Sequence, residues 1–313
     1  MSASQDNTKP ATGKGAAASG ETWYRSPVLA LVVTMFFWAT TTIIVRYAHG
    51  EVPPFALAFW RNAVGFLLIL PFAYSAVRRE WPVIRANLPL LCLLAALLWV
   101  GGNALLFLAL QYTIAINAAV INSVEPVFIV AAAALLFRDR ISRLQGLGIV
   151  LSMLGVLVLL TKGTFARLFE LNFNTGDLIV TCAYIFWSLY AVLLRKLPRD
   201  LDPRAMLLTI VGLGALFLFP IYMAETILVR AMPVTAMSVG MVLFLAAFSC
   251  AAGMFLWNYA IGRMGAIRAG QFLHLIPAFT VLLALAMLGE HLAGYHFAGI
   301  ALIAAGIAAT SRG

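Results

Sequence analysis

Apolar runs of about 20 residues recur along the chain, separated by short polar gaps. A helix of this length rises about 30 Å, which matches the thickness of the hydrocarbon core of a bilayer. We therefore predict an all-α membrane protein with ten transmembrane helices. Their predicted ranges are 27–47, 54–76, 88–110, 115–137, 142–161, 176–196, 204–226, 234–261, 266–288 and 293–311.

The amino-acid composition also requires a lipid environment. Hydrophobic residues make up 63% of the chain and charged residues 11%, against roughly 45–50% and about 25% in soluble domains. Because so few charges cannot cover the surface of a soluble fold, we expect the lipid bilayer to cover it. Residues 1–25 are polar and lack the arrangement of a signal peptide, so we predict a disordered cytoplasmic tail.

The net charge of +9 does not predict a nucleic-acid partner, because Lys and Arg occur in small groups between the apolar runs. This is the pattern that sets membrane orientation. If the N-terminus lies in the cytoplasm, 16 Lys and Arg fall on the inner side, four on the outer side, and Arg61 within a span. We therefore predict a multi-pass protein of the cytoplasmic (inner) membrane with both termini in the cytoplasm.

Metal and cofactor sites are not indicated by the sequence. Cys92, Cys182 and Cys250 lie far apart within apolar runs, which argues against a disulfide framework or a structural zinc site. The chain also lacks a GxxxxGK[ST] sequence that could cradle a nucleotide phosphate. We therefore expect no metal, no cofactor and no use of ATP.

The two halves of the chain repeat each other, first at an offset of 149 residues and then, after a slip of two residues, at 151. The matched pairs include Phe37 and Phe186, Trp38 and Trp187, Arg46 and Arg195, Pro54 and Pro203, Gly102 and Gly253, Pro126 and Pro277, Asp139 and Glu290, Gly148 and Gly299, and Gly155 and Gly306. The predicted repeats are residues 27–161 and 176–311. Since each contains five helices, an odd number, equivalent helices must cross the membrane in opposite directions. Secondary transporters use such inverted repeats to open alternately to the two sides.

The late helices of each half also carry a family resemblance. The stretch ALQYTIAINAAVINSVEPVFIVAAAALLFRDRISRLQGLGIVLSMLGVLVLL has a fourth helix with a central Pro, a charged turn and a Gly-rich fifth helix. It resembles the second half of an EamA domain, and residues 260–309 repeat it. The chain is thus similar to the EamA branch of the drug/metabolite transporter superfamily over roughly residues 27–311. The resemblance implies two EamA domains, a ten-helix basket and export of amino acids or other metabolites.

Glu125 is the leading candidate for a coupling or substrate-binding residue. It lies about ten residues into the fourth helix, roughly 15 Å deep, where a carboxylate is costly. Pro126 removes a backbone donor and would leave the carbonyl of Asn122 free, while Asn122 and Glu125 share a helix face. Glu125 therefore reads as a site for a proton or a substrate amine, or alternatively as a structural carboxylate. Ile276 replaces it in the second repeat, so its role is not duplicated.

The ninth helix offers a second polar centre. His274 lies three residues before Pro277, shares a face with Gln271, and corresponds to Ser123 in the repeat. We therefore expect His274 and Glu125 to face one central cavity. A hydrogen-bonded packing role for His274 is the alternative.

Other candidate substrate-binding residues either line the same predicted cavity or lie closer to the outer face of the membrane. Trp38 and Trp187 occupy equivalent mid-helix positions, where either a cavity lining or plain packing would place them. Further substrate-binding candidates are Asn103, Trp257, Asn258 and Tyr259. Arg61 either snorkels or pairs with Glu51, or it binds a substrate carboxylate.

Small residues form stripes on the fifth and tenth helices. Gly148, Ser152 and Gly155 lie on one, and Gly299 and Gly306 on the other. Close packing of helices explains such stripes. A contact between two copies in a homodimer is the alternative.

We therefore predict a secondary transporter that moves a small metabolite, plausibly an amino acid for export, by alternating access. Drugs or nucleotide-type metabolites are alternative substrates, and a passive channel is an alternative mechanism. A membrane-embedded enzyme is disfavoured because Glu125, His274 and Arg61 alone are clearly intramembrane. The remaining histidines, His49, His291 and His296, fall near the outer boundary without the spacing of a metal site.

Overall fold

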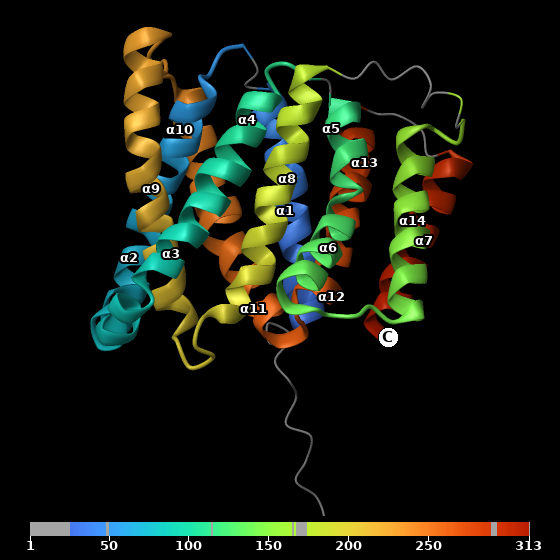
Figure 1. The fold of residues 1–313 in the computed structure, drawn as a ribbon. Coiled ribbons are helices and arrows are strands. Elements are labelled where there is room, and N and C mark those ends of the chain that lie inside the picture. The colour runs from blue at the N-terminus through green and yellow to red at the C-terminus, as the bar shows by residue number, and fades with distance from the viewer. Residues whose placement is uncertain are drawn as a thin grey trace, which may run out of the picture.

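The protein is a bundle of helices packed side by side, seen in a computed structural model (Figure 1). The structure describes residues 26–47, 50–113, 115–164, 166, 174–288 and 293–312, and every regular element within these ranges is helical. The predicted tail, residues 1–25, lies outside the described residues, as do His49 and His291.

The helices of the first half follow the predicted apolar runs. Their bounds are α1 (Pro27–Tyr47), α2 (Pro54–Ala86), α3 (Leu88–Ala95), the π-helix η2 (Ala96–Ala104), α4 (Leu105–Ala109), α5 (Ala115–Asn122), α6 (Glu125–Phe137) and α7 (Arg143–Leu160). The helix α2 ends ten residues beyond the predicted position. The charged residues after Ala76 end the apolar run there, but they do not interrupt the helical backbone.

The second half repeats this pattern. Its elements are α8 (Thr175–Leu193), the 3₁₀ turn η4 (Leu194–Lys196), α9 (Pro203–Leu228), α10 (Ala236–Phe244), the π-helix η5 (Leu245–Gly253), α11 (Met254–Met264), α12 (Ala266–Gly270), the 3₁₀ segment η6 (Gln271–His274), α13 (Leu275–Leu288) and α14 (Gly294–Arg312). The two π-helices begin 149 residues apart, and each contains one member of the repeated pair Gly102 and Gly253, which are 151 residues apart.

Eight described helical stretches are long and apolar enough to cross a membrane. The predicted spans 266–288 and 293–311 are helical but fall outside that group, and the second corresponds to a shorter apolar helix, Gly294–Thr310. The count of ten spans therefore stays a prediction. Breaks occur before both predicted prolines. Two residues separate the end of α5 from α6, which begins with Glu125 and Pro126, and η6 precedes Pro277.

Two helix pairs join the halves face to face. α2 packs against α9, where Phe59 stacks on Tyr222 with ring centroids 4.7 Å apart. α7 packs against α14, where a Cβ on Gly148 would lie 2.5 Å from the carbonyl oxygen of Gly306 and one on Gly155 would lie 2.6 Å from that of Gly299. The predicted small-residue stripes therefore serve a contact within one chain. Both pairs run antiparallel (Figure 1).

One tryptophan–glycine contact occurs twice: each half supplies the tryptophan once and the glycine once. The Trp38 ring lies against Gly253, and the Trp187 ring lies against Gly102 in the same way. At each glycine an added Cβ would come within about 3 Å of the indole, 3.1 Å for Gly253 and 2.6 Å for Gly102. The exchange follows the sequence repeat, in which Trp38 corresponds to Trp187 and Gly102 to Gly253.

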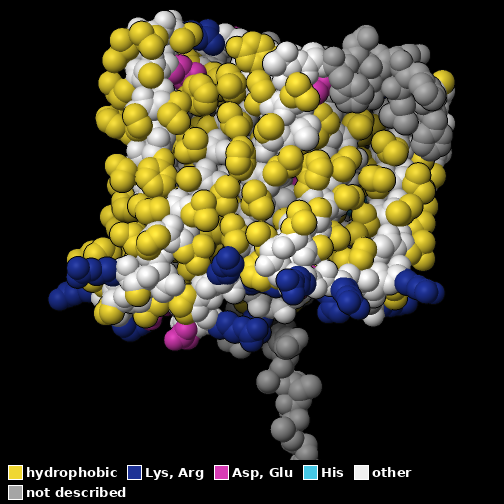
Figure 2. Space-filling view, viewed as in Figure 1, with side chains coloured by type: hydrophobic (Ala, Val, Ile, Leu, Met, Phe, Trp, Pro, Cys, Tyr) yellow, Lys and Arg dark blue, Asp and Glu magenta, His cyan; other side chains and the backbone are white. Residues whose placement is uncertain are grey.

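The outer surface is banded by residue type. Figure 2 shows hydrophobic side chains over most of the visible side, and Lys and Arg gathered along the end where Figure 1 places the C-terminus. We call this end, which carries Arg195, Arg199, Arg263 and Arg268, the basic face, and the opposite end the far face. The apolar band between them is the surface that lipid would cover.

Candidate functional site

Glu125 lies inside the bundle and takes part in hydrogen bonds with Asn122 and Ser188. Glu125 is the first residue of α6 and is 3% exposed. The side-chain amide of Asn122 donates to its Oε2 at 3.1 Å, which confirms that the two side chains share a face. The hydroxyl of Ser188 on α8 donates to the backbone carbonyl of Glu125 at 3.5 Å. The break before Pro126 therefore sets the carboxylate where helices of both halves meet.

His274 connects three helical segments. Its Nε2 lies 2.8 Å from the carbonyl oxygen of Ser123, beside the α5–α6 break, and its Nδ1 lies 2.7 Å from the hydroxyl of Ser152 on α7. The same hydroxyl lies 3.4 Å from Oε1 of Gln271. We predicted that the break before Pro126 would free the carbonyl of Asn122. The carbonyl that His274 contacts belongs to the next residue, Ser123.

Glu125 and His274 come close through the Ser123 carbonyl, which His274 contacts two residues before Glu125. His274 is fully buried, and neither residue lines the pocket described below. His274 is thus buried and hydrogen-bonded, and a cavity that it shares with Glu125 stays a prediction.

Three tryptophans gather where the halves meet. The ring centroid of Trp38 lies 5.1 Å from that of Trp187 and 5.3 Å from that of Trp257. Trp187 also contacts Tyr190, one turn further along α8, at 6.1 Å. The cluster includes all three tryptophans predicted from the sequence, and edge-on contacts of this kind stabilise an apolar centre.

Two buried donors, one in the aromatic cluster and one in the residue that follows it, lack partners among the described residues. The Tyr190 hydroxyl donates to Oδ1 of Asn258 at 2.8 Å. Within the described residues, neither Nδ2 of Asn258 nor Nε1 of Trp257 has a hydrogen-bond partner. Buried donors without acceptors are costly, so their presence points to a ligand or water that accepts from them.

The remaining predicted residues lie apart from this centre. The side-chain amide of Asn103 donates to the carbonyl of Leu98 in its own π-helix at 2.8 Å, so Asn103 is occupied within one helix. Tyr259 is half-buried, and the guanidinium of Arg263 lies 5.3 Å from the centre of its ring.

Arg61 neither snorkels nor pairs with Glu51. It is 2% exposed, and its guanidinium lies 5.0 Å from the Trp99 ring and 4.9 Å from the Phe107 ring. None of the ion pairs among the described residues includes it, and its Nε and Nη2 have no hydrogen-bond partner there. The expected pairing was wrong because α2 turns Arg61 inward, against the aromatic residues of the third predicted span.

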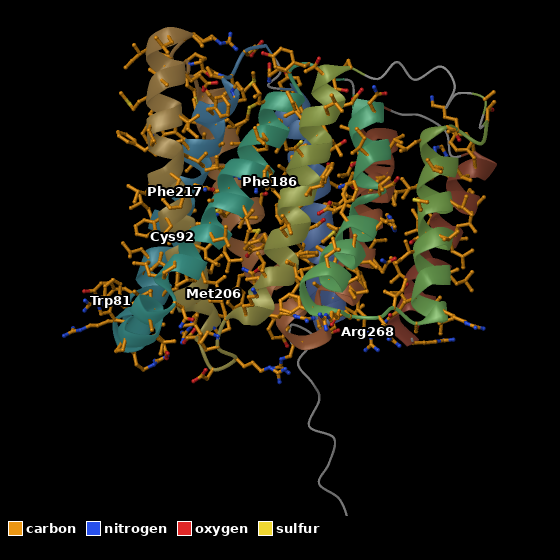
Figure 3. All side chains as sticks on the ribbon, viewed as in Figure 1. Trp81, Cys92, Phe186, Met206, Phe217 and Arg268 are labelled. Carbon is orange, nitrogen blue, oxygen red and sulfur yellow. The ribbon has the colours of Figure 1, made fainter. Side chains whose placement is uncertain are left out.

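A pocket of about 670 Å³ opens at the basic face. Figure 3 shows Met206 and Arg268, two of its lining residues, toward that end. Its polar lining includes Asp139, Arg195, Arg199, Asn258, Arg263 and Arg268. Gly265, which has φ +82°, forms the turn between α11 and α12 that borders the pocket, a conformation that a side chain would strain.

A different set of contacts joins three helices at the far face. The buried Asp177, near the start of α8, accepts from the hydroxyl of Thr113 and from Nδ2 of Asn117, the latter at 2.9 Å. It also accepts from the backbone N–H of Asn174 at 2.8 Å. We call these four residues the far-face network. They join the end of α4, the start of α5 and the start of α8.

Several of these groups could not be found from the sequence. Ser152 belongs to a small-residue stripe, and nothing in that pattern shows that it bonds His274. Tyr190 carries no signal beyond its place one turn after Trp187. Asp177 does have one: Asn174 and Asp177 form a capping box that predicts a helix start. The sequence does not show that Thr113 and Asn117 reach the same carboxylate.

These features define a multi-pass helical membrane protein with two related halves. The sequence profile of the EamA-like transporter family matches residues 25–161 and 174–312, which are the two halves. The chain therefore belongs to the EamA-like transporter family, as the resemblance predicted. It is a membrane transporter and not an enzyme.

Similar proteins cover nearly the whole chain. An uncharacterised transporter of Bacillus subtilis, YyaM, is 27% identical over 88% of this chain and 90% of its own length. A probable amino-acid metabolite efflux pump of Salmonella typhimurium is 27% identical over 89% of this chain and 92% of its own length. A solved crystal structure with 20% identity superposes with a TM-score of 0.72 over 90% of this chain and 95% of that one, which shows a common fold.

Proposed function

We propose that this protein is a secondary carrier that exports small metabolites, plausibly amino acids, across the cytoplasmic membrane by alternating access. The observation that carries the proposal is the exchange of contacts between the halves. Trp38 packs on Gly253 as Trp187 packs on Gly102, and the antiparallel pairs α2–α9 and α7–α14 lie where a two-fold axis would pass. Such an axis would lie in the membrane plane, as in inverted-repeat carriers.

The two ends of the molecule support one conformational assignment. The basic face holds the pocket, while Asp177 and its partners close the far face. Because cytoplasmic loops are enriched in Lys and Arg, the basic face is the cytoplasmic side in this proposal. The conformation is then inward-open, and export requires a second state in which the far-face network separates.

The choice of solute rests on similarity alone. The Salmonella relative is named a probable amino-acid metabolite efflux pump, and a relative from Escherichia coli has the same name. Amino acids are therefore the first solutes to test, with drugs and nucleotide-type metabolites as the alternatives.

Counterflow in proteoliposomes tests the proposal. Vesicles with the purified protein are loaded with one unlabelled amino acid, and entry of the labelled compound is followed; empty liposomes are the control. A carrier gives saturable entry that is accelerated by the solute inside, because the loaded site returns faster than the empty one. Entry that rises linearly with concentration and ignores the internal solute would identify a channel instead.

A further inference from the structure

We propose that the pocket at the basic face recognises a carboxylate, and that Asn258 with Arg199, Arg263 and Arg268 selects anionic or zwitterionic solutes over organic cations. This inference rests on the proposed carrier function and names the class of its substrate. It concerns the pocket itself and does not depend on Glu125 or on coupling.

The inner end of the pocket presents an unpaired donor. Asn258 lines the pocket, is 7% exposed, and its Oδ1 accepts from the Tyr190 hydroxyl. This hydrogen bond orients the amide, which leaves Nδ2 without a partner among the described residues. A buried NH₂ group of this kind is stabilised only by an acceptor, which a ligand in the pocket can supply.

The walls of the pocket carry cations that no described carboxylate neutralises. Of its described lining residues, Asp139 is the acidic one, and it is bonded to Arg195, which also stacks on Phe137. Arg199, Arg263 and Arg268 take part in none of the ion pairs among the described residues.

Arg263 is held beside the pocket by its contact with Tyr259. An aromatic ring attracts a guanidinium but leaves its N–H groups available to a ligand. The pocket therefore offers positive charge from its rim and a neutral donor from its inner end.

This donor set matches one ligand chemistry. A carboxylate accepts hydrogen bonds at both oxygens and pairs with guanidinium groups in two-point contacts. An organic cation would meet like charge at the rim and would leave Nδ2 of Asn258 unpaired. The orientation rule explains why arginines lie at this end. It gives no reason for a buried unpaired amide at the inner end of the same pocket.

The ligand test compares three forms of each solute. The full-length protein is placed in phosphatidylcholine nanodiscs, which contain no anionic lipid. Alanine, leucine and phenylalanine are each titrated as the free amino acid, the N-acetyl derivative and the methyl ester, with thermal unfolding as the readout. We expect free and N-acetyl forms to raise the unfolding temperature in a saturable way and the esters to leave it unchanged. Stabilisation by the esters equal to that by the acids would overturn the proposal.

Anionic lipid headgroups and inorganic phosphate carry related charge, so two further arms separate them from the solute. Inorganic phosphate is titrated alone, and the amino-acid titrations are repeated in nanodiscs that contain phosphatidylglycerol. If phosphate or the anionic lipid alone stabilises the protein, and no carboxylic acid does, the pocket is a headgroup site and the proposal fails.

Variants locate the binding. Asn258→Asp keeps the size of the side chain and can still accept from Tyr190, but it puts an anion where the carboxylate should bind. We expect it to weaken binding about tenfold or more, as expected when a hydrogen bond to a charged group is lost. Arg263→Gln and Arg199→Gln, which change exposed residues and should fold normally, should weaken it by about threefold or more. Arg85→Gln removes an Arg of α2 outside the pocket and should leave binding unchanged.

The outcomes also separate this proposal from the carrier function. Equal binding by Asn258→Asp, Arg263→Gln and the unmodified protein would refute carboxylate recognition here, while saturable counterflow would leave the carrier intact. Absence of counterflow for every solute, with acid-selective binding retained, would refute the carrier and keep the binding site.

Discussion

At the scale of single residues, Glu125 is a buried ionisable group that packing alone does not explain. Its side chain accepts from Asn122 and its backbone carbonyl accepts from Ser188, at the point where α6 begins. A carboxylate buried in the bundle is costly unless it is protonated or paired. We therefore expect it to exchange a proton during the transport cycle.

The substitution Glu125→Gln tests this role. Gln retains the shape of the side chain and the hydrogen bond from Asn122, but it cannot release a proton. We expect flux in proteoliposomes to fall by about tenfold or more, because the side chain can no longer carry a proton through the transport cycle, and to become independent of pH. Glu80→Gln, which removes a carboxylate of the same size beside Arg79, is the matched control and should behave as the unmodified protein. Normal flux in Glu125→Gln with an unchanged pH profile would exclude coupling through this residue.

At the scale of elements, the contact between α7 and α14 depends on the absence of side chains. A Cβ on Gly148 would lie 2.1 Å from the hydroxyl of Thr310 and 2.5 Å from the carbonyl of Gly306. In lipid, helix pairs gain stability from close backbone approach, since there is no hydrophobic effect between them. These glycines therefore hold the late helices of the two halves together.

Gly148→Ala should separate the two helices and reduce stability by about 2 kcal/mol, the usual range for overpacking. The measurement is thermal or denaturant unfolding in detergent. Gly240→Ala is the matched control: Gly240 lies in α10 with nothing within 4 Å of an added Cβ. Alanine there should be neutral or stabilising by up to about 1 kcal/mol, because it favours helix. Equal stability of the two variants would contradict the packing argument.

At the scale of the whole molecule, the two faces differ: hydrogen bonds join helices at one, and a pocket opens at the other. Asp177 holds α4, α5 and α8 together at the far face, whereas Arg199, Arg263 and Arg268 border an open pocket at the basic face. In an alternating-access carrier, contacts of this kind determine which of two states is more populated. Removing the network should therefore shift the population toward the state that opens at the far face.

Asp177→Ala leaves Thr113 and Asn117 without this acceptor. The probe is a cysteine that replaces Ala118, which is 6% exposed, in a protein whose Cys92, Cys182 and Cys250 are changed to Ser or Ala. We expect a membrane-impermeant maleimide to react with it about tenfold faster in Asp177→Ala, which corresponds to a shift of about 1.4 kcal/mol between states. Asp200→Ala, in the loop before α9, is the control. Unchanged labelling would show that the network does not limit opening.

Much of the architecture could be predicted because lipid leaves the backbone few choices. A chain segment inside a bilayer must satisfy its own N–H and C=O groups, so an apolar run of sufficient length becomes a helix. The runs predicted to begin at residues 27 and 54 form helices that start at Pro27 and Pro54, and the run predicted from residue 204 forms a helix that starts at Pro203. The same physics fails at helix ends: α2 continues to Ala86, since leaving the membrane does not unwind a helix.

The candidate site was predicted only in part. Asn122 and Glu125 are three residues apart, so their contact could be predicted from local spacing, and it holds across the short break between α5 and α6. The predicted ion pair of Arg61 with Glu51 was wrong. The rotation of α2 directs Arg61 toward the neighbouring helices, where it contacts Trp99 and Phe107, and not toward Glu51. The bond between His274 and Ser152 joins residues 122 positions apart, and no local pattern encodes it.

The amino-acid sequence by itself determined that the chain is helical, where its apolar segments lie, that it has two related halves, and which family it belongs to. These properties follow from composition, periodicity and repetition along one dimension. The tertiary structure alone decided which polar groups meet: His274 with Ser152, Asp177 with Thr113, and Asn258 with the arginine-lined pocket. The physical reason is that such meetings depend on how each helix is rotated and how closely it packs on its neighbours, which the sum of many small side-chain contacts sets.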